Sequence, residues 1–305
     1  MGCGSLVLGI LILFASNVVI AKMYKAITST HPAPTPFLGV SRYNPGYLFY
    51  PVMWFVWTGI LTLPLITFTM YRSWQIRQRE GKIFRIVVVL LIFAVFYIIG
   101  LSFVAQKTSR YMVIFLPTIS LLTAIGAMQI ARLTQKKWIS YLVLVIIFSV
   151  QALPILRLYP YYRAYYHPLL SAKWVEEKTA PITGAGLDLA ADYLNAKPDA
   201  ERLRVRHTWF CKDFAHYFIG ETGYYKYDPS THNFDYDLEY LYDRQIIHTP
   251  MDISEDTTYR KAALKREQTV PRKLEHIIRL NGVNYVWIYR VIKPEPTDNT
   301  DGLSG

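Results

Sequence analysis

Two cations near the middle of the chain, Lys107 and Arg110, have the types and spacing to bind a phosphate group. They lie three residues apart beside apolar runs and can converge on one anion, since Arg offers a bidentate fork and Lys a point charge. Tyr111 follows directly, and Pro117 lies within the next apolar run. The alternative is that both are ordinary helix-end charges whose side chains reach toward a membrane surface, and charge alone favours this alternative.

A second stretch with binding character is the loop Lys22–Gly46, which contains His31 and Arg42. The Pro32–Pro36 segment fixes an irregular, semi-rigid backbone, which suits a binding loop laid over a cavity. A plain connector explains the same prolines equally well.

The apolar half of the chain offers no group for acid–base chemistry. Proton transfer needs a carboxylate or His within hydrogen-bond reach, and the one acid before Leu158 is Glu80, among basic residues. His207, Cys211 and His216 have spacings of four and five, which fit no zinc pattern. The sequence contains no Gly-rich phosphate loop, Ser-centred elbow, CxxC pair or HExxH motif. We therefore assign no catalytic residue and no metal ligand.

Charge divides the chain into two halves of different kinds. Met1–Arg157 has 14 Lys and Arg against one acid, a net of +13, whereas Leu158–Gly305 has 19 against 21, a net of −2. With 52% apolar residues overall, this composition indicates a membrane region joined to a soluble one. It excludes a disordered chain, a disulfide-rich small protein and a nucleic-acid binder.

Five apolar runs are long enough to cross roughly 30 Å of hydrocarbon as helices. None contains an acid, and each is too continuous for an amphipathic surface helix, so buried helices of a soluble protein are the weaker alternative. The runs are Leu6–Ala21, Tyr47–Tyr71, Ile86–Ala105, Tyr111–Ala131 and Trp138–Leu156. The sequence thus predicts an all-α membrane region over residues 1–157.

The basic residues of the loops predict how this region is oriented. Loops 71–85 and 132–137 hold eight Lys and Arg, and the loops on the opposite side hold five. Because cytoplasmic loops carry the excess of basic residues, we expect a cytoplasmic N-terminus and an extracytoplasmic region after Leu156. The expected location is a cell membrane, multi-pass, of a prokaryotic cell. Cys3 and Cys211 then lie on opposite sides and form no disulfide.

Residues 158–305 are predicted to form a small extracytoplasmic α/β domain with a frayed C-terminal tail. The aromatic stretch Leu158–Leu170 suits the membrane interface, with a sugar-stacking surface as the alternative. The expected elements are helices over Leu187–Leu194 and Arg272–Leu280, the latter closed by Asn281-Gly282, strands over Arg202–Phe210 and Val283–Ile292, and an exposed excursion over Lys226–Thr257.

Several segments, in this order, resemble the dolichyl-phosphate-mannose mannosyltransferase-like proteins of the GT-C superfamily (glycosyltransferase family 39 type), whose bacterial relatives include aminoarabinose transferases. The similarity covers most of the chain from His31 onward. Its motifs are Lys107-Thr108-Ser109-Arg110-Tyr111 with Pro117, His31 with Phe37-Leu38-Gly39 and Pro45-Gly46-Tyr47, Tyr165–Leu170, Gly184–Asn195 and Gly282–Val286.

The resemblance implies an inverting transferase that moves a sugar from a polyprenyl-phosphate donor to a glycan, lipid or protein acceptor on the outer face of the membrane. Lys107 and Arg110 would neutralise the lipid phosphate, and Tyr111, His31 and Arg42 would line the same cavity. Divalent metal dependence stays open, since it differs among GT-C enzymes.

The family's catalytic carboxylate lies in its first extracytoplasmic loop, and Lys22–Gly46 contains neither Asp nor Glu. The resemblance therefore implies the C-terminal portion of a longer transferase, or a degenerate relative. The alternative from another class is a non-catalytic membrane scaffold or a subunit that binds a glycan or partner protein.

Overall fold

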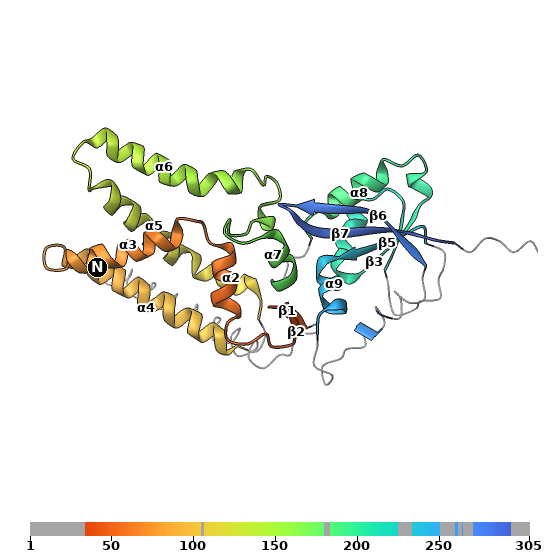
Figure 1. The fold of residues 1–305 in the computed structure, drawn as a ribbon, viewed down its shortest axis with the longest axis horizontal. Helices are drawn as coiled ribbons and strands as arrows, with labels where there is room; N and C mark the ends of the chain where they lie inside the picture. The colour runs from red at the N-terminus through yellow and green to blue at the C-terminus, as the bar shows by residue number, and fades with distance from the viewer. Residues whose placement is uncertain are drawn as a thin grey trace, which may run out of the picture. The chain divides into compact units, whose positions relative to one another are not determined.

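The computed structural model describes residues 34–104, 107–179, 184–224, 234–250 and 271–293, with Arg260, Lys261 and Leu264. The chain forms two compact units, Met1–Thr179 and Ala180–Gly305, the first mainly helical and the second built on a sheet (Figure 1). The division falls later than the boundary expected after Arg157. The reason is that residues 158–179 pack back onto the first unit, where the His167 amide donates to the Val56 carbonyl at 2.6 Å.

The first unit is a group of helices with a small hairpin before it. In chain order its elements are β1 (Thr35–Phe37), β2 (Val40–Arg42), α2 (Phe49–Trp57), α3 (Thr62–Gln75), α4 (Gly81–Phe103), η1 (Ser109–Ile114), α5 (Leu116–Ala131), α6 (Lys137–Leu156), η2 (Tyr162–Ala164) and α7 (Ala172–Lys178). Strands β1 and β2 pair antiparallel.

Within the described residues, two helices, α4 and α6, are long and apolar enough to cross a membrane, or three spans exist if a bent pair counts as one. The prediction of five continuous spans is therefore wrong for this part of the chain, although α4 and α6 match two of them. The expected span Leu6–Ala21 lies outside the described residues.

Two expected spans are interrupted for identifiable reasons. Tyr47–Tyr71 divides into α2 and α3, bent by 104° (Figure 1), because Thr58 takes an extended conformation with ψ 151° after α2. Tyr111–Ala131 begins as the 3₁₀ helix η1, and α5 starts afresh at Leu116 with Pro117 in its first turn. Proline favours that position because it has no amide hydrogen to donate to the preceding turn.

Helices α3 and α5 pack closely at Gly126. The Thr69 hydroxyl, which is wholly buried, donates both to the Leu65 carbonyl of its own helix at 2.8 Å and to the Leu122 carbonyl of α5 at 2.9 Å. A Cβ atom added at Gly126 would meet the Leu65 carbonyl oxygen and lie 2.5 Å from Thr69 Oγ1. The small residue is therefore what lets the two backbones approach.

The second unit is a five-stranded mixed sheet with helices. Its elements are α8 (Leu187–Asn195), η3 (Ala200–Arg202), β3 (Arg204–His207), η4 (Trp209–His216), β4 (Glu221–Tyr224), β5 (Tyr236–Tyr240), α9 (Leu241–His248), β6 (Arg272–Leu280) and β7 (Val283–Val291). The strand order is β4-β3-β5-β7-β6, with β3 parallel to both neighbours and β7 antiparallel to both. The mixed α/β character, helix α8 and strand β7 are confirmed.

The expected helix over Arg272–Leu280 is wrong, because this segment is strand β6, paired with β7. Asn281 and Gly282, taken as a helix end, have φ of 52° and 81°. Two successive positive φ values make a type I′ turn, whose twist suits a two-residue β-hairpin. The apolar residues of β6 match a helical period only because a bulge shifts the strand's alternation between Leu274 and His276.

The expected exposed excursion over Lys226–Thr257 is also wrong in its described part, since β5 is the central strand and all five of its residues are buried. Asp237 and Glu239 of β5 have no exposed surface. Arg206 and Arg272 contact Asp237 at 3.2 and 2.8 Å, and Arg272 and Arg244 lie 3.8 and 3.5 Å from Glu239. Arginines of three other elements thus compensate the buried charges, and two of them, Arg206 and Arg272, are distant in sequence from β5.

Replacing Asp237 by Asn should destabilise the second unit by about 3 kcal/mol, because removing one partner leaves Arg206 and Arg272 as uncompensated buried charges. The measurement is hydrogen exchange of β5 and β7 peptides in the full chain, which should become faster. Asp192→Asn, the same change on an exposed α8 residue, is the matched control. Equal effects of the two substitutions would show that the buried network does not support the sheet.

Replacing Gly126 by Ala should destabilise the first unit by about 1–3 kcal/mol, since the added methyl group forces α3 and α5 apart. Gly100→Ala is the control, because a Cβ at that position of α4 meets nothing within 4 Å, and it should leave stability unchanged or slightly raised. The thermal midpoint of the detergent-solubilised chain distinguishes them. An unaltered midpoint for Gly126→Ala would contradict the close packing.

Candidate functional site

The segment that carries Lys107 and Arg110 contacts the start of α2 through the Tyr50 side chain. The Lys107 ammonium is 5.6 Å from the centroid of the Tyr50 ring, and the Tyr50 hydroxyl accepts a hydrogen bond from the Thr108 amide at 3.2 Å. Phe49, next to Tyr50, makes edge contacts with Tyr50 and with Phe37 of β1, both at 5.2 Å. Segment 107–111 and the β1–β2 hairpin therefore meet at the same end of α2.

Lys107 itself is buried, with 3% of its surface exposed. Its ammonium donates to the carbonyl oxygens of Ser102 at 2.8 Å and Val104 at 2.6 Å, which lie at the C-terminal end of α4. A cation at this end of a helix satisfies orphan carbonyls and complements the helix dipole. Burial lowers the pKa of Lys107. In this structure Lys107 is a helix cap, and its predicted contact with a phosphate stays a prediction.

Arg110 is the exposed cation of the pair. Among the residues that the structure describes, no carboxylate or carbonyl group pairs with its guanidinium, and the same is true of Arg42 at the end of β2. Tyr111 is half-buried, and its carbonyl accepts a hydrogen bond from the Tyr97 hydroxyl of α4 at 2.7 Å. The backbone that carries Arg110 is thus fixed to α4 while its side chain is open to a ligand. His31, the remaining predicted residue, lies outside the described residues.

Sequence reasoning missed a second set of contacts that fixes α2. The buried ring of His167 stacks on Phe55 with centroids 4.7 Å apart, and burial lowers the pKa of His167. The Tyr165 hydroxyl donates to the Thr58 carbonyl at 3.1 Å, at the break after α2. The hairpin is joined to α7 by the Leu38 amide, which donates to the Lys178 carbonyl at 2.7 Å. An apolar run gives no signal for these pairings.

The chemistry available at this end of the first unit is anion binding. The only carboxylates between residues 34 and 179 are Glu80, Glu176 and Glu177. Glu176 and Glu177 lie on α7, which the hairpin contacts through Leu38 and Lys178, whereas residues 34–57 and 107–116 contain no Asp or Glu. Glu80 lies in the loop before α4, 3.9 Å from Arg132 after α5, and therefore at the other end of these helices. Across the described part of the chain, no three His, Cys, Asp or Glu side chains gather as a metal site requires.

Comparisons of the chain with protein-family models, with curated proteins and with solved structures find no match. The functional conclusion therefore depends on the residue patterns and on the geometry at α2.

Replacing Tyr50 by Phe should loosen segment 108–114, because the Thr108 amide loses its acceptor. We expect hydrogen exchange of these amides to become about fivefold faster, corresponding to about 1 kcal/mol for one hydrogen bond. Tyr47→Phe is the control: Tyr47 is 66% exposed and contacts Phe103 through its ring, with centroids 5.4 Å apart. Unchanged exchange in Tyr50→Phe would refute the anchoring role of the hydroxyl.

Proposed function

We propose that the chain supplies the donor-binding part of an integral-membrane glycosyltransferase of the GT-C type. In this proposal a polyprenyl-phosphate sugar donor places its phosphate beside Arg110, where η1, α2 and the β1–β2 hairpin meet. The acceptor is a glycan, lipid or protein on the extracytoplasmic face. The sequence motif around Lys107 and Arg110 supports the proposed reaction class, and the exposure of Arg110 supports the proposed position of the phosphate.

The observation that carries the proposal is the open guanidinium of Arg110 at the end of apolar helices. Helix α6 has no buried residue, and large apolar side chains of α4 and α6 are exposed, among them Phe96 at 70% and Phe148 at 73%. Such surfaces favour a lipid environment. A cation at the end of such helices lies at the depth of lipid phosphates, and Arg binds phosphate bidentately.

The loop charges support the orientation that we propose. Glu80 and Arg132 contact each other at 3.9 Å, so the two most basic loops lie at the same end of the helices. We place that end in the cytoplasm of a prokaryotic cell, which puts Arg110 and the second unit on the extracytoplasmic side.

A second candidate function is non-catalytic: a membrane subunit that holds a lipid phosphate or a glycan for another protein. It is favoured by one observation: the segments that form this region, residues 34–57 and 107–116, contain no Asp or Glu. An assay that follows both donor binding and sugar transfer distinguishes the two functions. Binding without transfer would support the second candidate.

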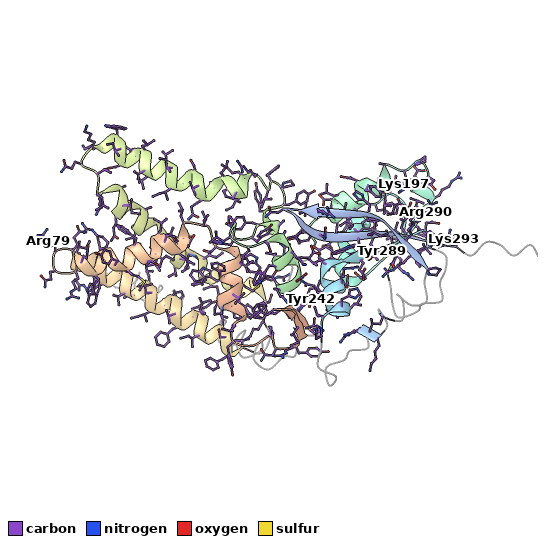
Figure 2. The ribbon with its side chains drawn as sticks, in the orientation of Figure 1. Arg79, Lys197, Tyr242, Tyr289, Arg290 and Lys293 are labelled. Atoms are coloured by element: carbon purple, nitrogen blue, oxygen red, sulfur yellow. The ribbon has the colours of Figure 1, made fainter. Side chains whose placement is uncertain are left out.

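Replacing Arg110 by Gln should weaken binding of a polyprenyl phosphate by about 10- to 100-fold, since a charge-assisted hydrogen bond contributes about 1.5–3 kcal/mol. Binding is measured with the full chain in lipid nanodiscs. The matched control is Arg79→Gln, in the loop between α3 and α4 (Figure 2). Equal affinity of the Arg110 variant and the unaltered chain would overturn the proposed site.

A further inference from the structure

The second unit contains a cavity of about 670 Å³ at one end of its sheet. The residues that matter here are Lys197, Asp235, Tyr236, Lys273, Arg290 and Lys293, all of which line it. Figure 2 shows Lys197, Arg290 and Lys293 at the same end of the sheet. Its volume lies in the range of sites for small organic ligands, roughly 300–1,000 Å³, and exceeds what a single bare ion needs.

Strand register places two cations side by side in this cavity. Arg290 of β7 is the direct partner of Lys273 in β6 and of Tyr236 in β5. Directly opposed residues of neighbouring strands project from the same face of a sheet, and like charges so placed repel each other. Both side chains are exposed, and among the described residues neither forms an ion pair or a hydrogen bond. An anion bound between them would remove the repulsion.

The other two cations of the cavity are already paired. The Lys293 ammonium contacts Asp235 Oδ1 at 2.6 Å. The Lys197 ammonium contacts Glu275 Oε1 at 2.5 Å and lies 4.8 and 5.2 Å from the ring centroids of Tyr193 and Tyr236. Glu275 also accepts hydrogen bonds from the hydroxyls of Tyr193 at 2.8 Å and Tyr236 at 3.2 Å. These contacts fix the wall beside Arg290.

Hydrogen bonding between Lys197 and Glu275 favours the charged form of both side chains. Burial alone would lower the pKa of Lys197, but its hydrogen bonds to Glu275 and Tyr236 outweigh burial and raise it. Burial alone would raise the pKa of Glu275, but hydrogen bonds from Lys197 and Tyr193 lower it. The lining side chains comprise four cations and two carboxylates, Asp199 and Asp235. With Glu275 added, the group still carries a net positive charge.

We propose that this cavity binds a small organic phosphate of about the size of a hexose phosphate. Arg290 supplies a bidentate fork and Lys273 a second positive charge, a pair that matches the two negative charges of a phosphate monoester. The lining also includes Leu203 and Ile292, which supply apolar contacts for the organic part. The inference is independent of the lipid-phosphate site proposed at Arg110.

The test is a titration of the full chain in nanodiscs with glucose 6-phosphate, followed by ³¹P NMR line broadening. Saturable binding is expected, and the double variant Lys273→Gln and Arg290→Gln should weaken it at least tenfold. Arg279→Gln is the matched control. Arg279 is exposed and lies on β6, as Lys273 does, but it does not line the cavity, and its Nε donates to Asn284 Oδ1 at 2.7 Å. It should bind as the unaltered chain does.

Two further variants separate binding in this cavity from binding in the first unit and from a loss of folding. Arg110→Gln should leave glucose 6-phosphate binding intact. If this variant no longer bound glucose 6-phosphate, the binding would belong to the first unit, and the proposal would be wrong. If the double variant fails to fold, Arg290→Lys serves as the test instead. It keeps the positive charge but loses the bidentate fork, so we expect an affinity between those of the unaltered chain and a chain that does not bind. Three outcomes would each overturn the proposal. They are the absence of saturable binding, a loss of affinity in Arg279→Gln equal to that in the double variant, and tighter binding of glucuronate than of glucose 6-phosphate.

Discussion

A charged group that is buried must be compensated by polar or oppositely charged groups of the protein. This constraint acts within each of the two units. In the first unit the buried Lys107 ammonium is matched by the carbonyls that end α4, which fixes where the chain turns and where Arg110 emerges. In the second unit, Asp237 and Glu239 of the central strand require arginines from β3, α9 and β6. The central position of β5 in the sheet therefore depends on the pairing of its two carboxylates with these arginines.

The long helices could be predicted from sequence because an uninterrupted apolar run of about 20 residues has few other stable conformations. The break between α2 and α3 could not be predicted, since mean hydropathy does not register a change of chain direction at Thr58. Strand β5 was missed because Asp237 and Glu239 look like surface residues when their arginine partners, Arg206 and Arg272, are distant in sequence. For β6, the Asn281-Gly282 pair was the signal that should have outweighed the helical spacing.

The candidate site shows the same limit. Residue types and spacing identified Lys107 and Arg110, but could not show that one is a buried cap and the other an open cation. That difference depends on the contacts of Lys107 with the carbonyls that end α4 and on Tyr50, whose hydroxyl accepts a hydrogen bond from the Thr108 amide. Likewise, the Lys273 and Arg290 pair exists only through β6–β7 register. Contacts between segments distant in sequence, which composition does not encode, distinguish the charged residues that are paired within the fold from those that are exposed.

Helix α6 has a mechanical consequence of its own. No residue along it is buried, so packing within the described unit does little to oppose rolling of the helix about its long axis. The Gln151 side-chain amide donates to the Thr62 hydroxyl at the start of α3, at 3.3 Å. Near the other end of α6, the Ser140 hydroxyl donates to the Ala131 carbonyl of α5 at 2.8 Å. In apolar surroundings, where water does not compete for these groups, the two side-chain hydrogen bonds together oppose rotation of α6 about its long axis.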